Sequence, residues 1–190
     1  LLRAAGTRVA AWCVDNPFHL LSGLRSAYWK DMDLAVTDAS FLPTLAGLGA
    51  RRLLHLPLAA WPGHLGPAAA WPSPAAAGLQ DRLVFVGRSA FPDRDAFFAG
   101  SAPDPEAEKR ARSLLRTGQR PDFSWWVKEL GVAPLWPGNA VRRAGCGAGR
   151  TGLAWRTLCL EAAADLPLTV FGDAGWSGLL PPDADLRGPL

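Results

Sequence analysis

The sequence has few of the residues on which small secreted or metal-stabilised domains depend. Its 190 residues include three cysteines, Cys13, Cys146 and Cys159. They are too few and too far apart for a zinc knuckle or a disulfide framework. Cys13 lies in an apolar run, where a thiol behaves as a small hydrophobe. We therefore expect a reduced, cytoplasmic setting.

Long apolar runs and clustered charge are also missing. No run approaches the ~20 residues that a transmembrane helix needs, and the N-terminus lacks the charged-then-apolar layout of a signal peptide. The formal net charge is +3 and the basic residues are scattered, whereas a nucleic-acid-binding protein shows a basic stripe or patch. We expect no transmembrane segment and no nucleic-acid partner; peripheral association with a membrane stays open.

Two common catalytic signatures are absent from the sequence. There is no GxxxxGK[ST] and no GxSxG, which argues against a P-loop enzyme and an α/β-hydrolase. Cys146 has no histidine near it in sequence that would activate it as a nucleophile. These common enzyme classes are therefore disfavoured.

The first sixty residues contain three short apolar runs, each typical of a strand. They are Arg8–Val14 (RVAAWCV), 34–36 and 52–56, and each ends in polar residues or proline. A helix is predicted over Phe41–Leu48, with Ser40 as its N-cap and Gly49 just past its end. Strands that are apolar on both faces and separated by helices indicate a parallel sheet covered by helices.

A change in composition divides the chain. Residues 59–78 are rich in Pro, Ala and Gly and cannot form a regular element through their prolines. We therefore expect a first domain at 1–58, a linker at 59–80 and a second domain at 81–190. The expected fold class is α/β, with two incomplete Rossmann-like halves, each built on a parallel sheet.

The second domain begins with another strand-like run, Leu83–Arg88. A second strand is predicted at Leu168–Phe171. Gly-rich, basic residues predict a loop at 142–151, and the last segment, 181–186, is expected to be a loop as well. Three helices are predicted between the two strands, over residues 105–117, 123–130 and 153–164.

Glycine and charged residues follow both strands of the second domain. Gly87-Arg88-Ser89 follows one and Gly172-Asp173 the other. In an open parallel sheet, ligands bind outside the carboxyl ends of the strands. Glycine lets a phosphate approach the backbone, and a guanidinium is a planar donor to anionic oxygens. Gly87-Arg88-Ser89 thus suits a diphosphate, and Asp173 suits a ribose; the alternative is two ordinary turns.

The segment Asp15-Asn16-Pro17-Phe18-His19 crowds a carboxylate, an amide and an imidazole into one loop. Asp15 is a candidate catalytic base or sugar ligand, with His19 assisting it. The structural alternative is an Asx-turn at Asn16-Pro17 with His19 starting a helix. Asp38 ends the next strand, so Asp15, Asn16 and Asp38 are expected at one edge of the sheet.

Several of these segments, in this order, resemble a known family. From about Val9 to Leu190 the chain is similar to bacterial glycosyltransferase-like proteins of the spore-maturation or family-1-like type. The similarity is strongest at Val86-Gly87 and Val170–Trp176. The segments that carry it are WCVDNPF, AVTD, LHLPLA, VFVGRSAF and GLAWRTLCLEAAADLPLTVFGDAGW.

This resemblance implies the GT-B fold, with an acceptor-side and a donor-side domain. Asp15 and His19 would then serve catalysis, and Asn16 and Asp38 the acceptor. The donor, a nucleotide-diphosphate sugar, would meet Gly87, Arg88, Ser89, Gly172 and Asp173. The acceptor would be a glycan, lipid or protein, with no metal or other cofactor.

Complete members of that family continue with a donor-gripping acidic helix, so we expect the chain to be a fragment that is inactive alone. The alternative function is a non-catalytic nucleotide- or glycan-binding module of a cell-surface assembly system.

Overall fold

A computed structural model describes residues 5–59, 78–132 and 139–188. The chain forms two compact units, and each takes segments from several parts of the sequence. The first unit comprises Leu1–Ala59, Phe98–Lys109 and Pro121–Ala148. The second unit comprises Ala60–Phe97, Arg110–Arg120 and Gly149–Leu190.

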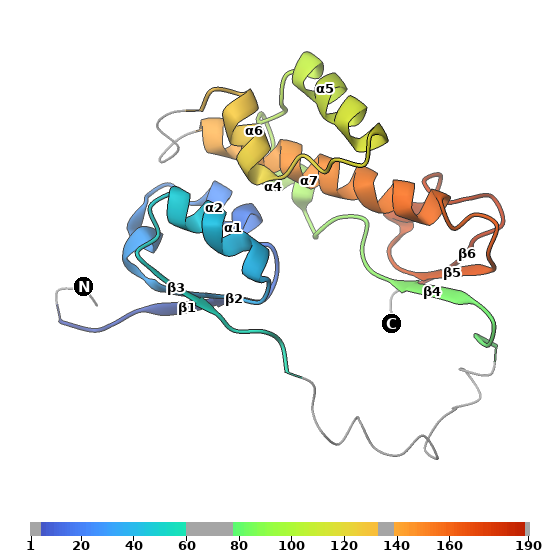
Figure 1. The fold of residues 1–190 in the computed structure, drawn as a ribbon, viewed down its shortest axis with the longest axis horizontal. Helices are drawn as coiled ribbons and strands as arrows, with labels where there is room; N and C mark the ends of the chain where they lie inside the picture. Colours follow the sequence, from blue (N-terminus) through green and yellow to red (C-terminus); the bar gives the residue numbers. More distant parts are fainter. Residues whose placement is uncertain (1–4, 60–77, 133–138, 189–190) are drawn as a thin grey trace. The chain divides into compact units, whose positions relative to one another are not determined.

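The first unit is built on a three-stranded parallel sheet with the order β1-β2-β3 (Figure 1). The strands are β1 (Ala10–Cys13), β2 (Asp33–Val36) and β3 (Arg52–His55). Helices α1 and α2 lie on one side of this sheet (Figure 1). The connections hold α1 (Pro17–Gly23), η1 (Tyr28–Asp31), η2 (Ala39–Phe41) and α2 (Leu42–Gly47).

The two faces of the first sheet differ in solvent exposure. Leu34 and Val36 of β2 are buried, whereas Trp12 of β1 and Leu54 of β3, which share a register row, are about half exposed. Successive side chains of a strand point to opposite faces. The buried face therefore belongs to the core, and the face bearing Trp12 and Leu54 is open among the described residues.

The second unit has its own parallel sheet, with the order β4-β5-β6. The strands are β4 (Leu83–Val86), β5 (Leu168–Phe171) and β6 (Asp185–Arg187), and η5 (Ala174–Trp176) follows β5. The core joins Leu160 and Trp176 to two residues of β5, Leu168 and Val170. Two separate parallel sheets with helices confirm the predicted fold class.

The remaining helices are α4 (Arg94–Phe97), α5 (Pro105–Arg116), α6 (Phe123–Glu129) and α7 (Asn139–Glu161). The prediction of helices over 105–117 and 123–130 is confirmed. α6 begins after Asp122, whose carboxylate accepts a hydrogen bond from the Trp125 N–H at 2.8 Å. That bond satisfies one of the amide groups that a helix start leaves without a partner.

The prediction of a Gly-rich loop at 142–151 is wrong, because these residues lie inside the 23-residue helix α7. Their glycines serve close packing. A Cβ on Gly145 would lie 2.5 Å from the Ser22 Oγ, and one on Gly147 would lie 2.4 Å from the Trp126 ring. Tertiary contact here outweighs the poor helix propensity of glycine.

Other boundaries differ more modestly from expectation. The helix expected over Phe41–Leu48 is a 3₁₀ turn followed by α2, and its entry is capped by Asp38 instead of Ser40. Gly49 follows its end with a positive φ of 97°, which glycine adopts readily. The tail expected to be a loop contains β6, which is too short for its alternation to be recognised. Most of the expected linker, residues 60–77, lies outside the described residues.

Across 5–59, 78–132 and 139–188, no helix is both long and apolar enough to cross a membrane.

Replacing Gly147 with alanine tests whether close packing explains the glycines of α7. The new Cβ would overlap the Trp126 ring, so Gly147→Ala should lower the free energy of unfolding by about 1–3 kcal/mol. Gly152→Ala is the matched control in the same helix, because its nearest neighbour is the Arg120 Nη2 at 3.7 Å. It should stabilise by about 0.5–1 kcal/mol. Urea denaturation followed by circular dichroism measures both; equal effects would contradict the packing explanation.

Candidate functional site at the carboxyl ends of β4 and β5

The loops that follow β4 and β5 are in direct contact. The strands pair in parallel from Leu83↔Leu168 to Val86↔Phe171, and the Gly87 N–H extends the ladder to the Phe171 carbonyl at 3.0 Å. A Cβ on Gly172 would lie 2.5 Å from the Gly87 carbonyl oxygen. Because a backbone atom cannot move aside as a side chain can, this approach requires glycine at position 172.

Asp173 ties these two loops together. One carboxylate oxygen accepts the Ser89 N–H at 2.9 Å, and the other accepts the Ser89 hydroxyl at 2.5 Å and the Gly175 N–H at 2.9 Å. Desolvation acts to raise the pKa of Asp173, but the hydrogen bonds from Ser89 and Gly175 outweigh it and hold the pKa below its usual value. Asp173 is therefore a charged latch between the loops.

Arg156 of α7 holds the same loop from another direction. Its guanidinium donates to the carbonyl oxygens of Arg88 at 2.5 Å and Ser89 at 3.0 Å, and it lies over the Trp176 ring at 5.5 Å. The Trp176 indole N–H donates to the Gly87 carbonyl at 2.8 Å. Burial is the main cause that lowers the pKa of Arg156, followed by the charge of Arg120, while Asp173 opposes both. The Arg156 guanidinium nevertheless stays protonated at neutral pH.

Arg88 is exposed to solvent, but its backbone is fixed, because its carbonyl accepts a hydrogen bond from Arg156. A guanidinium is thus presented at the carboxyl edge of a parallel sheet on a backbone that is already ordered. The Ser89 N–H of this turn is not available to a ligand, because it is bound to Asp173. No helix follows β4 directly, since α4 begins at Arg94.

Two of the residues that build this site were not found by sequence reasoning. Arg156 lies 68 residues beyond Arg88, and nothing in its neighbourhood marks it as a loop ligand. Trp176 was noted as the end of a similar segment, without a role. Only the fold brings either residue to Gly87-Arg88-Ser89.

In the first unit, Asp15, Asn16 and Asp38 follow two paired strands. The Thr37 hydroxyl donates to the Val14 carbonyl at 3.1 Å and joins the two strand ends. Asn16 caps α1 through the Phe18 N–H at 3.0 Å, and Asp38 caps η2 through the Ser40 N–H at 2.8 Å. The side chains of Asn16 and Asp38 thus cap helices. Asp15 is exposed.

His19 lies within α1, where it is half-buried and its carbonyl accepts the Ser22 hydroxyl at 2.9 Å. Pro17 occupies the first turn of that helix, a position that suits its fixed φ and missing N–H. Phe18 is buried and stacks on Phe123, with ring centroids 4.6 Å apart. The DNPF sequence therefore starts and anchors a helix.

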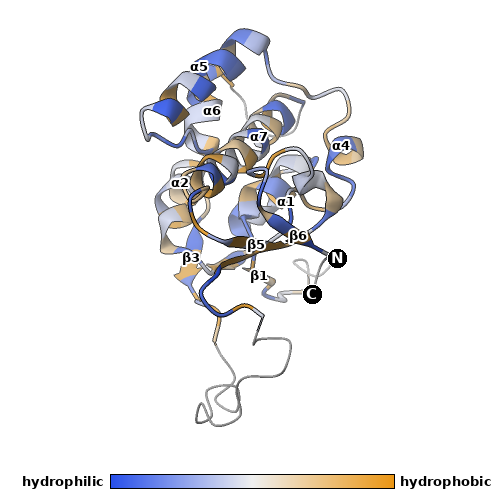
Figure 2. Ribbon diagram, turned by 90° about the vertical axis from the view of Figure 1, so that its right-hand side faces the viewer, coloured by the Kyte–Doolittle hydropathy of each residue, from blue (hydrophilic) through white to orange (hydrophobic). Residues whose placement is uncertain are grey.

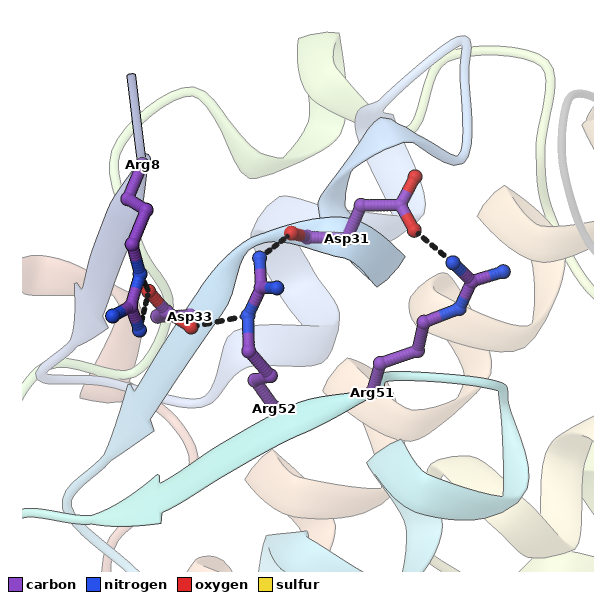
Figure 3. A network of polar contacts seen from close by, with 5 residues as sticks. All are labelled: Arg8, Asp31, Asp33, Arg51 and Arg52. Atoms are coloured by element: carbon purple, nitrogen blue, oxygen red, sulfur yellow. Dashed lines mark hydrogen bonds and ion pairs between the residues drawn. The ribbon is translucent and has the colours of Figure 1, made fainter. Parts of the chain in front are cut away.

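A charge network occupies the opposite, amino-terminal edge of the first sheet (Figure 3). Asp33 accepts Arg8 at 2.8 Å and also pairs with Arg52. Asp31 pairs with Arg51 at 2.9 Å, and its carbonyl accepts Arg52. Desolvation acts to raise the pKa of Asp33, but Arg8 and Arg52 lower it below its usual value. These contacts join the starts of all three strands at the edge away from Asp15.

Within the described ranges, no three His, Cys, Asp or Glu side chains gather in a way that could hold a metal ion. Burial raises the pKa of the Cys13 thiol, so Cys13 is protonated at neutral pH and is a poor nucleophile.

No protein-family model, curated protein or solved structure matches this chain.

The latch made by Asp173 predicts a specific acid dependence. A carboxyl whose pKa is lower in the folded state stabilises the fold above its unfolded pKa, near 3.9, and this contribution is lost as the pH falls through the folded pKa. Asp173→Asn should therefore lower the melting temperature at pH 7, and its difference from wild type should shrink below about pH 4.

Asp165→Asn is the control for this experiment, because Asp165 is an exposed carboxylate of the same unit. Melting temperatures from pH 7 to pH 3 compare the three proteins. A difference between wild type and Asp173→Asn that does not change with pH would show that the charge of Asp173 is not what stabilises the loops.

Proposed function

We propose that the chain is a glycosyltransferase-like protein of the GT-B kind, whose second unit takes the diphosphate of a nucleotide-sugar donor. The observation that carries the proposal is the exposed Arg88 at the carboxyl end of β4, on a loop whose carbonyls are held by Arg156. Pre-ordered donors gain affinity because less conformational freedom is lost on binding.

The contact that joins the β4 and β5 loops supports this proposal. Asp173 holds Ser89, so in the proposal Ser89, Gly172 and Asp173 position the loop and Arg88 contacts the phosphates. Gly87 contributes its lack of a side chain, although the Phe85 ring would lie 3.0 Å from a Cβ at that position. A bidentate guanidinium recognises phosphate through two parallel hydrogen bonds.

The first unit would serve the acceptor, which in this proposal is a glycan, lipid or protein. Its exposed carboxylate, Asp15, follows β1 directly and is the candidate base for the acceptor hydroxyl. Asn16 and Asp38 would shape the same edge through the helix starts that they cap, and His19 would assist from α1. The proposed setting is the bacterial cytoplasm, with peripheral membrane association if the acceptor is a lipid.

A non-catalytic binding module is the second candidate, and one observation favours it. Both carboxylate oxygens of Asp173 already accept hydrogen bonds from the loops. The β4–β5 edge would then bind a diphosphate through Arg88 without supplying a carboxylate to the reaction. Release of the sugar from a bound donor would support the enzyme, and tight binding without turnover would support the module.

Replacing Arg88 with alanine tests the donor site. Calorimetric titration should show that Arg88→Ala lowers the affinity for a nucleoside diphosphate about ten-fold or more, since a hydrogen bond to a charged group is worth about 1.5–3 kcal/mol. Binding of the corresponding nucleoside should change little, because it presents no charge to the guanidinium.

Arg187→Ala is the matched control. Arg187 belongs to β6 of the same sheet, but its guanidinium is paired with Asp185 at 2.8 Å. It should leave both affinities nearly unchanged. Equal losses for nucleoside and diphosphate in Arg88→Ala, or equal losses in the two arginine variants, would overturn the proposed role of Arg88.

A further inference from the structure

A cavity of about 380 Å³ lies in the second unit, and none of its lining residues belongs to 87–89 or 172–176. It is open to solvent and lies within the size range of small-molecule pockets, roughly 300–1,000 Å³. Four of its lining residues are arginines and one is a glutamate, Glu161. The arginines are Arg94, Arg112, Arg116 and Arg150.

The C-terminal part of α7 forms one wall of this cavity. Its lining residues recur at three- and four-residue spacing from Arg150 to Glu161, which is one face of a helix. That face is about 16 Å long at 1.5 Å per residue. Positive charge lies at its start, negative charge at its end, and apolar side chains between, among them Leu153 and Leu158.

The end of α5 supplies another part of the lining. Arg112 and Arg116 are four residues apart and both are exposed, whereas Leu115 between them is buried. α5 is predominantly hydrophilic along its length (Figure 2). The cavity therefore combines exposed guanidinium groups with an apolar interior, to which Leu179 also contributes.

We propose that this cavity binds a small anionic amphiphile, that is, a molecule with a phosphate head and a short apolar tail. The arginines take the head, because guanidinium groups pair with phosphate oxygens. The leucines take the tail, whose transfer from water is favourable. Glu161 disfavours a ligand that is anionic at both ends. This binding site goes beyond the proposed donor site and shares none of its residues.

Titration of the whole chain with n-octyl phosphate, n-octanol and inorganic phosphate tests the proposal. We expect n-octyl phosphate to bind at least ten-fold more tightly than either of the other two, because only it presents both the charge and the apolar tail. An equal affinity for octanol, or for inorganic phosphate, would overturn the proposal that the ligand is an amphiphile.

Two variants locate the binding. Arg116→Gln should weaken n-octyl phosphate about ten-fold, while Arg25→Gln, an equal change of charge at an exposed residue of the first unit, should not. Equal effects of the two arginine variants would contradict the site.

Vesicles separate a free amphiphile from a lipid surface. The chain is mixed with phosphatidylcholine vesicles, with and without phosphatidic acid, and sedimented. We expect n-octyl phosphate to bind in the absence of any vesicle. Binding to phosphatidic acid vesicles without binding of n-octyl phosphate would overturn the proposal, since the ligand would then be a surface and not a molecule in the cavity.

Discussion

The close approach of Gly172 to the Gly87 carbonyl is the contact on which the candidate site depends. With 2.5 Å between that oxygen and the place of a Cβ, any side chain at 172 would separate the loops that follow β4 and β5. The Asp173 latch and the Trp176 hydrogen bond to Gly87 both require this closeness. Arg156 then acts on a loop whose position is already set, and Arg88 is left exposed at its end.

The same physical device recurs in the first unit. Gly145 and Gly147 of α7 let the helix pack against Ser22 and Trp126 with no space for a methyl group. Gly145, Gly147 and Gly172 thus permit contact between elements, whereas Gly49 adopts a positive φ at a turn. Ala at position 145 or 147 would favour the local helix but exclude the neighbour, so tertiary packing decides the residue.

Much of the fold could be predicted from the sequence, because short apolar runs that end in polar residues are a local signal. Such runs predict β1 to β5, and the distribution of charged and apolar residues predicts α5 and α6. The helical state of residues 142–151 could not be predicted, since their glycines depend on Ser22 and Trp126 from distant segments. The three residues of β6 form a strand only because β5 lies beside them.

The candidate site could likewise be predicted only in part. The strand-end rule identified Gly87-Arg88-Ser89 and Gly172-Asp173, which the structure brings into contact. It could not show that Asp173 bonds to Ser89, or that Arg156 would arrive from α7, because both contacts span more than sixty residues.

Backbone amide NMR shifts, followed as a nucleoside diphosphate is titrated into the chain, test most directly whether the loops after β4 and β5 form the donor site. We predict that the shifts which change cluster at residues 87–90 and 172–175. Changes confined to other residues, or none at saturating ligand, would contradict it.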